Sequence, residues 1–190
     1  QHDPIQLLWT CGEHLKRQPN KADVEEVRES IYKHLAERGE PASYLHVHAA
    51  GLIALAKSHA LKQTNQEFDE ALRGTQSLMQ TALEDDPRFV HYSNGENVDT
   101  GVWGLNEIRL ERASSSPSEN GGSAQPESLS DRAEIAVVTF LQKHPNSIFI
   151  EIEQDLYPRL PGLLTPSRAM IYAVLTSYAN KENGAWKLRP

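Results

Sequence analysis

A chain of 190 residues has room for one large domain or two small ones, and a net charge of −7 excludes a protein whose whole surface binds nucleic acid. The single Cys11 excludes an internal disulfide and a zinc site built on cysteines. No apolar run reaches the roughly 18 residues of a membrane span, and no signal peptide is visible. From these features we expect a soluble, cytoplasmic protein, and the start at Gln1 without a methionine suggests a fragment of a longer one.

The charge is uneven along the chain. Residues 1–130 hold 12 basic and 20 acidic side chains, a net charge of −8, whereas residues 131–190 hold 7 basic and 6 acidic side chains, a net charge of +1. Any surface that binds nucleic acid is therefore a local patch, and the C-terminal part is the better place for it.

The first 111 residues predict a helical domain that closes with a β-hairpin. Apolar residues at helical spacing predict helices over 3–15, 22–38, 47–61 and 65–84. Ser43-Tyr44-Leu45 fits either a short strand or the first turn of a helix. The segments 88–92 and 98–105 flank a polar turn, which predicts the hairpin.

Residues 112–130 form the clearest boundary in the chain. They are mostly Ser, Pro, Gly, Glu and Gln and have almost nothing to bury, which predicts a flexible linker. The sequence therefore predicts an N-terminal domain over 1–111 and a C-terminal domain over 131–190.

The C-terminal domain begins with a helix predicted over 131–143, in which Ile135, Val138 and Leu141 should face the core. Two further helices are expected. The first covers 150–157 and should stop at Pro158. The second covers 169–178, with Thr165 as its cap, Pro166 at its first position and a strand after Gly184.

A short pattern occurs twice in the chain. Gly101-Val102-Trp103-Gly104-Leu105 and Gly184-Ala185-Trp186-Lys187-Leu188 share Gly-x-Trp-x-Leu, and each follows a helical run and a polar turn. Both domains thus follow the order helix, short strand, helix, helix, hairpin. We expect a mainly α fold with small β-hairpin wings (α+β), arranged as a tandem winged helix-turn-helix.

Several phrases resemble the C-terminal portions of large bacterial DNA methyltransferase-like proteins of restriction and phage defence. They are Arg38-Gly39-Glu40-Pro41, His48-Ala49-Ala50, Gly101-Val102-Trp103-Gly104-Leu105, Pro161-Gly162-Leu163-Leu164-Thr165-Pro166 and Ser177-Tyr178-Ala179. The resemblance implies an accessory module that helps its parent protein engage DNA or a partner subunit. The methyltransferase motifs themselves, a glycine-rich cofactor loop and an Asn/Asp-Pro-Pro-Tyr/Phe motif, are not present in the sequence.

Catalytic and metal sites find little support in the sequence. His46 and His48 are two residues apart and do not share a helix face, and no acidic or cysteine ligand stands beside them. Glu151, Glu153 and Asp155 alternate as a solvated helix face would. Cys11 with His14 fits ordinary packing. We therefore expect a non-enzymatic module without a cofactor.

Duplex DNA is the partner that the predicted fold favours, because a winged helix presents the start of its second helix to the major groove and its wing to the backbone. In the C-terminal domain this geometry nominates six residues. They are Arg159, Ser167 and Arg168 near the helix start, and Lys181, Lys187 and Arg189 on the wing.

The N-terminal domain is a poorer candidate for DNA binding, because Asp69 and Glu70 lie on the corresponding helix and would repel phosphate. The plausible contacts there are Arg73, Gln76, Arg88 and His91. The alternative function is protein interaction, either with other parts of a parent complex or as a homodimer. That alternative gains if the basic residues of the C-terminal domain pair with Glu151, Glu153 or Glu182 instead of forming one face.

Overall fold

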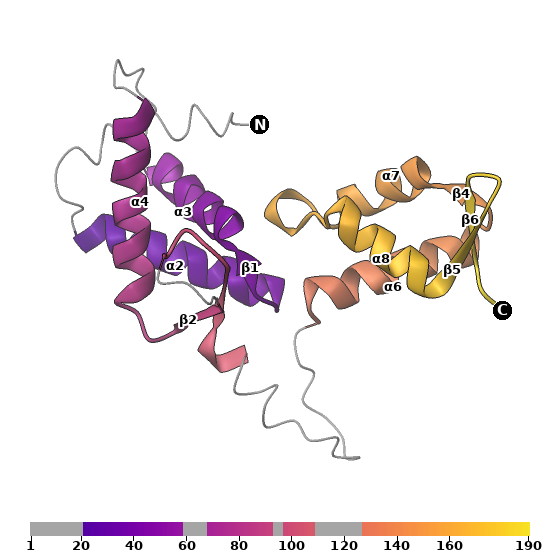
Figure 1. Cartoon of the computed structure of the whole chain (residues 1–190), viewed down its shortest axis with the longest axis horizontal. Coiled ribbons are helices and arrows are strands. Elements are labelled where there is room, and N and C mark those ends of the chain that lie inside the picture. Colours follow the sequence, from indigo (N-terminus) through magenta and orange to yellow (C-terminus); the bar gives the residue numbers. More distant parts are fainter. Residues whose placement is uncertain (1–20, 59–67, 93–96, 109–126) are drawn as a thin grey trace, which may run out of the picture. The chain divides into compact units, whose positions relative to one another are not determined.

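The computed structural model describes residues 21–58, 68–92, 97–108 and 127–190, with only the backbone given at 57–58 and 68–73. It divides into two compact units, Gln1–Gly121 and Gly122–Pro190 (Figure 1). The described residues form mainly helices and two small antiparallel sheets, which confirms the α+β class at that level. The helix predicted over 3–15 lies outside the described residues.

The first unit builds its described core on three helices and a small sheet. Its elements are α2 (Lys21–Arg38), β1 (Ala42–Ser43), α3 (Tyr44–Ser58), α4 (Phe68–Glu84), β2 (Phe89–Tyr92) and β3 (Val102–Leu105). The prediction for α2 is confirmed, because its apolar stripe is buried along the whole helix. Gly39 ends the helix with a φ of 68°, and its N–H donates to the Leu35 carbonyl oxygen.

Helix α3 begins at Tyr44 and not at the predicted Val47, because the chain passes from β1 directly into the helix. Gly51 in α3 allows a close approach to the other two helices. A Cβ atom at this position would lie 2.8 Å from Met79 Sδ on α4 and 3.1 Å from Val27 Cγ1 on α2. Helices α2, α3 and α4 therefore meet at Gly51, where any larger residue would have to displace the end of the Met79 side chain.

The sheet of the first unit has the order β1-β3-β2, so the hairpin prediction is confirmed, with a longer connection than expected. Trp103 in β3 lies opposite Ala42 of β1 and His91 of β2. Its ring is buried, and its Nε1 donates to the Val98 carbonyl oxygen at 3.0 Å. The hydrogen bond ties the turn at 97–100 to the core.

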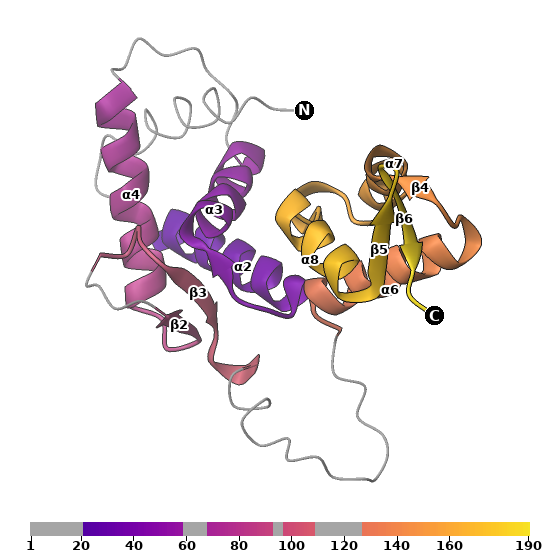
Figure 2. The same ribbon diagram turned by 45° about the vertical axis from the view of Figure 1, so that its right-hand side comes forward.

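The second unit places three helices against a second small sheet (Figure 2). Its elements are α6 (Leu129–Lys143), β4 (Ser147–Ile148), α7 (Phe149–Arg159), the 3₁₀ turn η1 (Gly162–Leu164), α8 (Arg168–Tyr178), β5 (Ala179–Glu182) and β6 (Ala185–Leu188). The sheet order is β4-β6-β5. Trp186 of β6 packs in the core among residues of all three helices.

Helix α6 differs from its prediction in both its start and its buried face. It begins at Leu129, and Ser128 caps it through a reciprocal pair of hydrogen bonds with Asp131. The end of the predicted linker is therefore folded, whereas residues 112–126 lie outside the described part. Ile135 was expected to face the core but is 52% exposed, because the buried face runs through Leu129, Ala133, Val137, Phe140 and Leu141.

The boundaries of α7 and α8 also correct the prediction. Pro158 lies inside the last turn of α7 and does not stop it, since the Leu160 N–H still closes that turn on the Leu156 carbonyl oxygen. The cap of α8 is Ser167 and not Thr165, whose N–H instead ends the η1 turn on the Gly162 carbonyl oxygen.

The hairpin of the second unit follows α8 without a loop and turns on two residues. Strand β5 begins at Ala179, directly after α8, and only Asn183 and Gly184 form the turn to β6. Both residues have positive φ angles, 50° and 86°, as a two-residue hairpin turn requires.

The described elements of the two units follow the same order, and their tryptophans occupy the same position in the two sheets. Among the elements named above, each unit has the order helix, strand, helix, helix, hairpin, and in each sheet the last strand lies between the other two. Trp103 stands opposite the first residue of β1, and Trp186 stands opposite the first residue of β4. The Gly-x-Trp-x-Leu pattern thus marks the same structural position twice.

Candidate nucleic-acid interface

The start of α8 is the part of the second unit that the sequence nominates for a DNA groove. Ser167 caps this helix, and its side-chain oxygen accepts a hydrogen bond from the Met170 N–H at 3.2 Å. Arg168 is the first residue of the helix and is largely exposed. The structure therefore places Ser167 and Arg168 where the sequence predicts, but Ser167 already uses its oxygen inside the protein.

Arg168 is bound to a carboxylate of the neighbouring helix α7. Its Nε donates to Glu153 Oε1 at 2.6 Å, and one of its terminal nitrogens donates to Glu153 Oε2 at 2.8 Å. Glu153 is only 2% exposed, and the Tyr157 hydroxyl donates to the same carboxylate at 2.6 Å. Hydrogen bonding to Arg168 holds the pKa of Glu153 below its usual value and raises that of Arg168. The bidentate pair leaves little net charge at this point.

Two further arginines of the second unit also have partners within it. Arg159 donates to Asp155, one turn earlier in α7, at 2.7 Å. The guanidinium group of Arg189 donates to the carbonyl oxygens of Thr176 and Ser177 at the end of α8, and to Asn180 Oδ1. Arg189 therefore caps the C-terminus of α8, where a cation is favourable.

The two lysines of the wing have no anionic partner among the described residues, but they do not share a face. Lys181 stands opposite Trp186 in the hairpin, and its Nζ lies 5.6 Å from the centre of that ring. Lys187 stands opposite Asn180, one position along, and therefore points to the other side. The nominated basic residues of the second unit thus do not form one exposed cationic face.

The exposed side of α8 is neutral and partly apolar after Arg168. It presents Ala169, Tyr172, Ala173 and Thr176. Tyr172 is 41% exposed and stacks on Phe149, the first residue of α7, with 4.4 Å between the ring centres. Tyr172 also meets the buried Trp186 edge-on at 6.1 Å. This face was not predicted as a site, although its uncharged residues at helical spacing are visible in the sequence.

In the first unit, Arg88 and His91 were suggested as DNA contacts, and both instead bind other groups of the protein. Arg88 binds Asp86 through Nε and a terminal nitrogen, binds Glu29 at 2.7 Å, and lies over the Tyr32 ring. His91 stacks on Trp103 and donates from Nε2 to the Thr100 carbonyl oxygen. Two other candidates lie on α4. Gln76 lines a cavity, and Arg73 belongs to the stretch for which only the backbone is described.

The described histidines and acidic residues that were considered as metal or catalytic groups make contacts within the first or the second unit. His46 shares a hydrogen bond with Ser43 through Nδ1, and His48 stacks on Tyr44. Within the described ranges no three His, Cys, Asp or Glu side chains are grouped closely enough to hold a metal ion. Glu153 was expected on a solvated face and is instead buried. The alternation of acids did not reveal this, because its partner Arg168 is 15 residues away.

Comparisons with known proteins add no relative to this picture. No family model, no curated protein and no solved structure matches the chain. In the described residues, no helix has the length and apolar character that crossing a bilayer requires. The resemblance to methyltransferase-like defence proteins therefore remains a prediction.

Proposed function

We propose that the chain is a non-enzymatic tandem winged-helix module and that its second unit binds a protein partner through the exposed face of α8. The shared layout of the two units supports the winged-helix assignment, because a three-helix core with a hairpin after the third helix is the plan of that fold. The partner fits another domain or subunit of the longer protein that the sequence resemblance implies.

The bidentate pair between Arg168 and the buried Glu153 is the observation that carries the choice of a protein partner. A helix that enters a DNA groove usually offers free cations or amides at its start, whereas this one offers a neutralised arginine followed by alanine and tyrosine. Interface cores are enriched in tyrosine and depleted in charge, which is the composition of the face around Tyr172.

Site-specific photo-crosslinking from α8 tests this function directly. A photoreactive phenylalanine analogue in place of Tyr172 is expected to give one adduct in cells that contain the full protein, and the adduct should survive nuclease and disappear on protease digestion. Tyr172 is suitable because it is partly exposed and aromatic. The same analogue at Gln142, an exposed position of α6, is the control and should give no such adduct. An adduct at Tyr172 that nuclease removes would assign the face to nucleic acid.

Binding of duplex DNA is the second candidate function, and the observation in its favour is the pair of exposed wing lysines, Lys181 and Lys187. Neither has an anionic partner among the described residues, so both are free to contact phosphate. Six residues of this unit were expected to contact DNA, and four of them are engaged within the protein. Only the two lysines remain as candidates, so any affinity for DNA must be weak.

The salt dependence of DNA binding follows from that reduction. With at most two phosphate contacts, the logarithm of the association constant should fall with the logarithm of salt concentration at a slope no steeper than about −2, which weakens binding by no more than about tenfold between roughly 50 and 200 mM salt. Fluorescence anisotropy with a labelled duplex measures the slope, and Lys187→Ala should reduce it by about one. Arg168→Ala is unsuitable as the test, because it leaves Glu153 buried without its cation. A slope near −5 would contradict the pairing of the arginines described above.

A further inference from the structure

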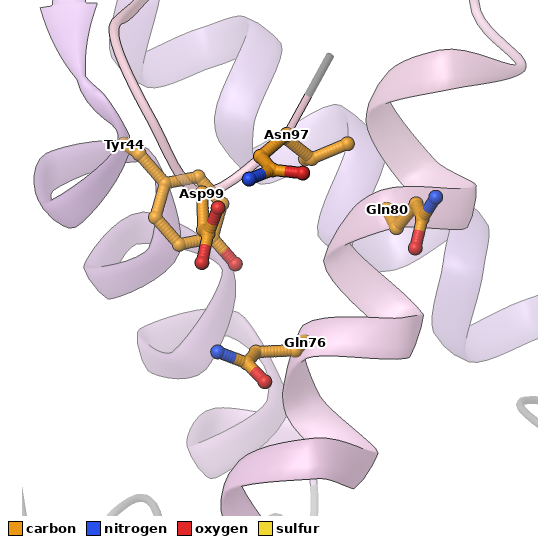
Figure 3. Close-up of a pocket in the computed structure, with 6 residues that line it drawn as sticks. Tyr44, Gln76, Gln80, Asn97 and Asp99 are labelled. Atoms are coloured by element: carbon orange, nitrogen blue, oxygen red, sulfur yellow. The ribbon is translucent and has the colours of Figure 1, made fainter. Parts of the chain in front are cut away.

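The first unit contains a polar cavity of about 320 Å³ between helix α4, the start of α3 and the turn before β3. Figure 3 shows Gln76 and Gln80 reaching into it from α4, with Tyr44, Asn97 and Asp99 on the opposite side. Val98 completes the described lining. The cavity therefore faces three side-chain amides, a phenol and a carboxylate, and no cation among its described lining residues.

The turn that carries Asn97 and Asp99 is held in place by the fold. The Thr100 N–H and hydroxyl both donate to the Asn97 carbonyl oxygen, and Trp103 Nε1 donates to the Val98 carbonyl oxygen. Asp99 is thus presented by a fixed turn, and the described residues supply no hydrogen bond or ion pair to its carboxylate. The backbone on this side of the site is therefore preformed and does not have to be ordered when a ligand binds.

The lining offers hydrogen-bond acceptors around one carboxylate, because each side-chain amide can turn its oxygen toward a donor. Gln80 Nε2 already donates to Glu84 at 3.0 Å, so its amide oxygen remains for a ligand. Asp99 can only accept, and Asn97 and Gln76 each add an amide oxygen. Burial and the charge of Asp99 raise the pKa of Tyr44 to about 12, so its hydroxyl stays neutral at physiological pH.

These features exclude an anion and favour a planar cation with several donors. A phosphate or carboxylate would meet Asp99 without any compensating positive charge from the described lining, in a part of the chain whose net charge is −8. A guanidinium group carries five N–H donors in one plane and matches a set of converging oxygens, whereas an ammonium group is a compact point charge. A nucleobase would carry its phosphates toward the same acidic unit.

We propose that this cavity receives an arginine side chain from a basic segment of the protein partner. The inference rests on the proposed protein-binding function, but it concerns the first unit, so it is tested apart from the face of α8. Asp99 supplies the charge, Gln76, Gln80 and Asn97 supply amide oxygens, and the edge of Tyr44 closes one side of the site.

A titration of the full 190-residue chain with the peptide acetyl-Gly-Arg-Gly-amide tests the proposal. A single side chain of this size is expected to bind with a dissociation constant on the order of 1 mM. The side-chain NH₂ signals of Gln76, Gln80 and Asn97 in ¹H–¹⁵N spectra report the contact directly. The same peptide with citrulline, which keeps the shape and loses the charge, should bind about tenfold more weakly.

Two isosteric variants distinguish binding in this cavity from attraction of the peptide to the overall negative charge of the unit. Asp99→Asn should weaken arginine binding about tenfold. Asp85→Asn removes an equal charge from an exposed position outside the cavity and should leave binding unchanged. Unchanged spectra at about ten times the expected dissociation constant, equal binding of the citrulline peptide, or equal affinity in Asp99→Asn would each overturn the proposal. Preferential binding of adenosine to the same three amides would overturn it in favour of a nucleobase site. A Tyr172 adduct to protein alongside any of these results would leave the function of α8 standing.

Discussion

Replacing Trp186 with alanine is expected to destabilise the second unit by about 3–5 kcal/mol, the usual cost of truncating a buried tryptophan. Its ring is 5% exposed and packs with residues of α6, α7 and α8 as well as β5. A domain of this size has a total stability of roughly 3–10 kcal/mol, so the substitution removes a large part of it. Urea unfolding followed by NMR signals of each unit measures the loss.

The effect should be confined to the unit that carries the substitution. Signals of α6, α7 and α8 should lose their dispersion at lower urea in Trp186→Ala, while those of α2 and α3 keep the wild-type midpoint, because each unit has a core of its own. Lys187→Ala, on an exposed neighbour of Trp186, is the matched control and should change stability by less than about 0.5 kcal/mol. A second unit that stays folded to the wild-type midpoint without Trp186 would contradict the packing described here.

The two tryptophans should respond differently to phenylalanine. Trp103 Nε1 donates to the Val98 carbonyl oxygen, whereas Trp186 Nε1 is buried without a hydrogen-bond partner among the described residues. Trp103→Phe therefore loses a hydrogen bond and leaves a carbonyl oxygen behind, while Trp186→Phe removes a buried N–H that was already unsatisfied. We expect Trp103→Phe to cost about 1 kcal/mol more than Trp186→Phe, and equal costs would argue against this difference.

The parts of the fold that were predictable from the sequence are those in which one local pattern decides the structure. The stripe of α2 and its glycine cap, and the two Gly-x-Trp-x-Leu strands, depend on residues within one turn or one strand of each other. Such patterns fix which face is buried, because burial follows the period of the element. The repeated layout followed from reading these elements in order.

Boundaries failed where two local signals competed. Thr165-Pro166 and Ser167 are both acceptable helix starts. Thr165 is the residue that ends η1, so α8 begins after it, and the Ser167 side-chain oxygen accepts from the Met170 N–H as its cap. Pro158 is a strong stop signal in isolation. It is tolerated in the last turn of α7, where the loss of one backbone hydrogen bond costs little beside the burial of Leu156.

The surroundings of the nominated site residues were beyond the sequence for a different reason. Whether Arg168 is free or paired depends on the angle at which α8 crosses α7, which brings Glu153 within 2.6 Å across 15 residues. The cavity around Asp99 likewise joins α3, α4 and a turn that are far apart in the chain. The sequence reveals which side chains are basic or polar. Tertiary packing decides which of them are paired within the protein and which are available to bind a partner.

The stability of the first unit is expected to fall as the pH drops, beginning at pH values above those at which its carboxylates titrate. His34 on α2 is buried, its Nε2 has no hydrogen-bond partner among the described residues, and burial, with Arg38 and His46 nearby, lowers its pKa from 6.5 to about 4. Burial also lowers the pKa of His48 on α3. Both side chains are therefore neutral in the folded protein at pH values where the unfolded chain protonates them.

The direction of the effect follows from proton linkage. A histidine whose pKa is depressed by folding binds fewer protons in the native state, so stability is full above the unfolded pKa of 6.5 and falls as the pH drops toward the folded value near 4. His34 alone should cost on the order of 2 kcal/mol between about pH 7 and pH 5. Asp86, whose pKa is lowered by Arg88, loses its contribution only at lower pH and does not obscure this interval.

Urea unfolding of the full chain at these two pH values, followed by signals of the first unit, measures the loss. His34→Leu removes one buried titrating group and its unsatisfied nitrogen, so the loss between these pH values should shrink by about the share of His34, while His48 keeps a remaining pH dependence and the stability near pH 7 changes little. His144→Leu, at an exposed position of the second unit, should keep the wild-type pH dependence of the first. If His34→Leu loses as much stability as the wild type over this interval, the acid sensitivity does not come from burial of His34. Because the effect arises from a core histidine and not from the surface, it should also persist at high salt, which separates it from the screened charges that surround the two units.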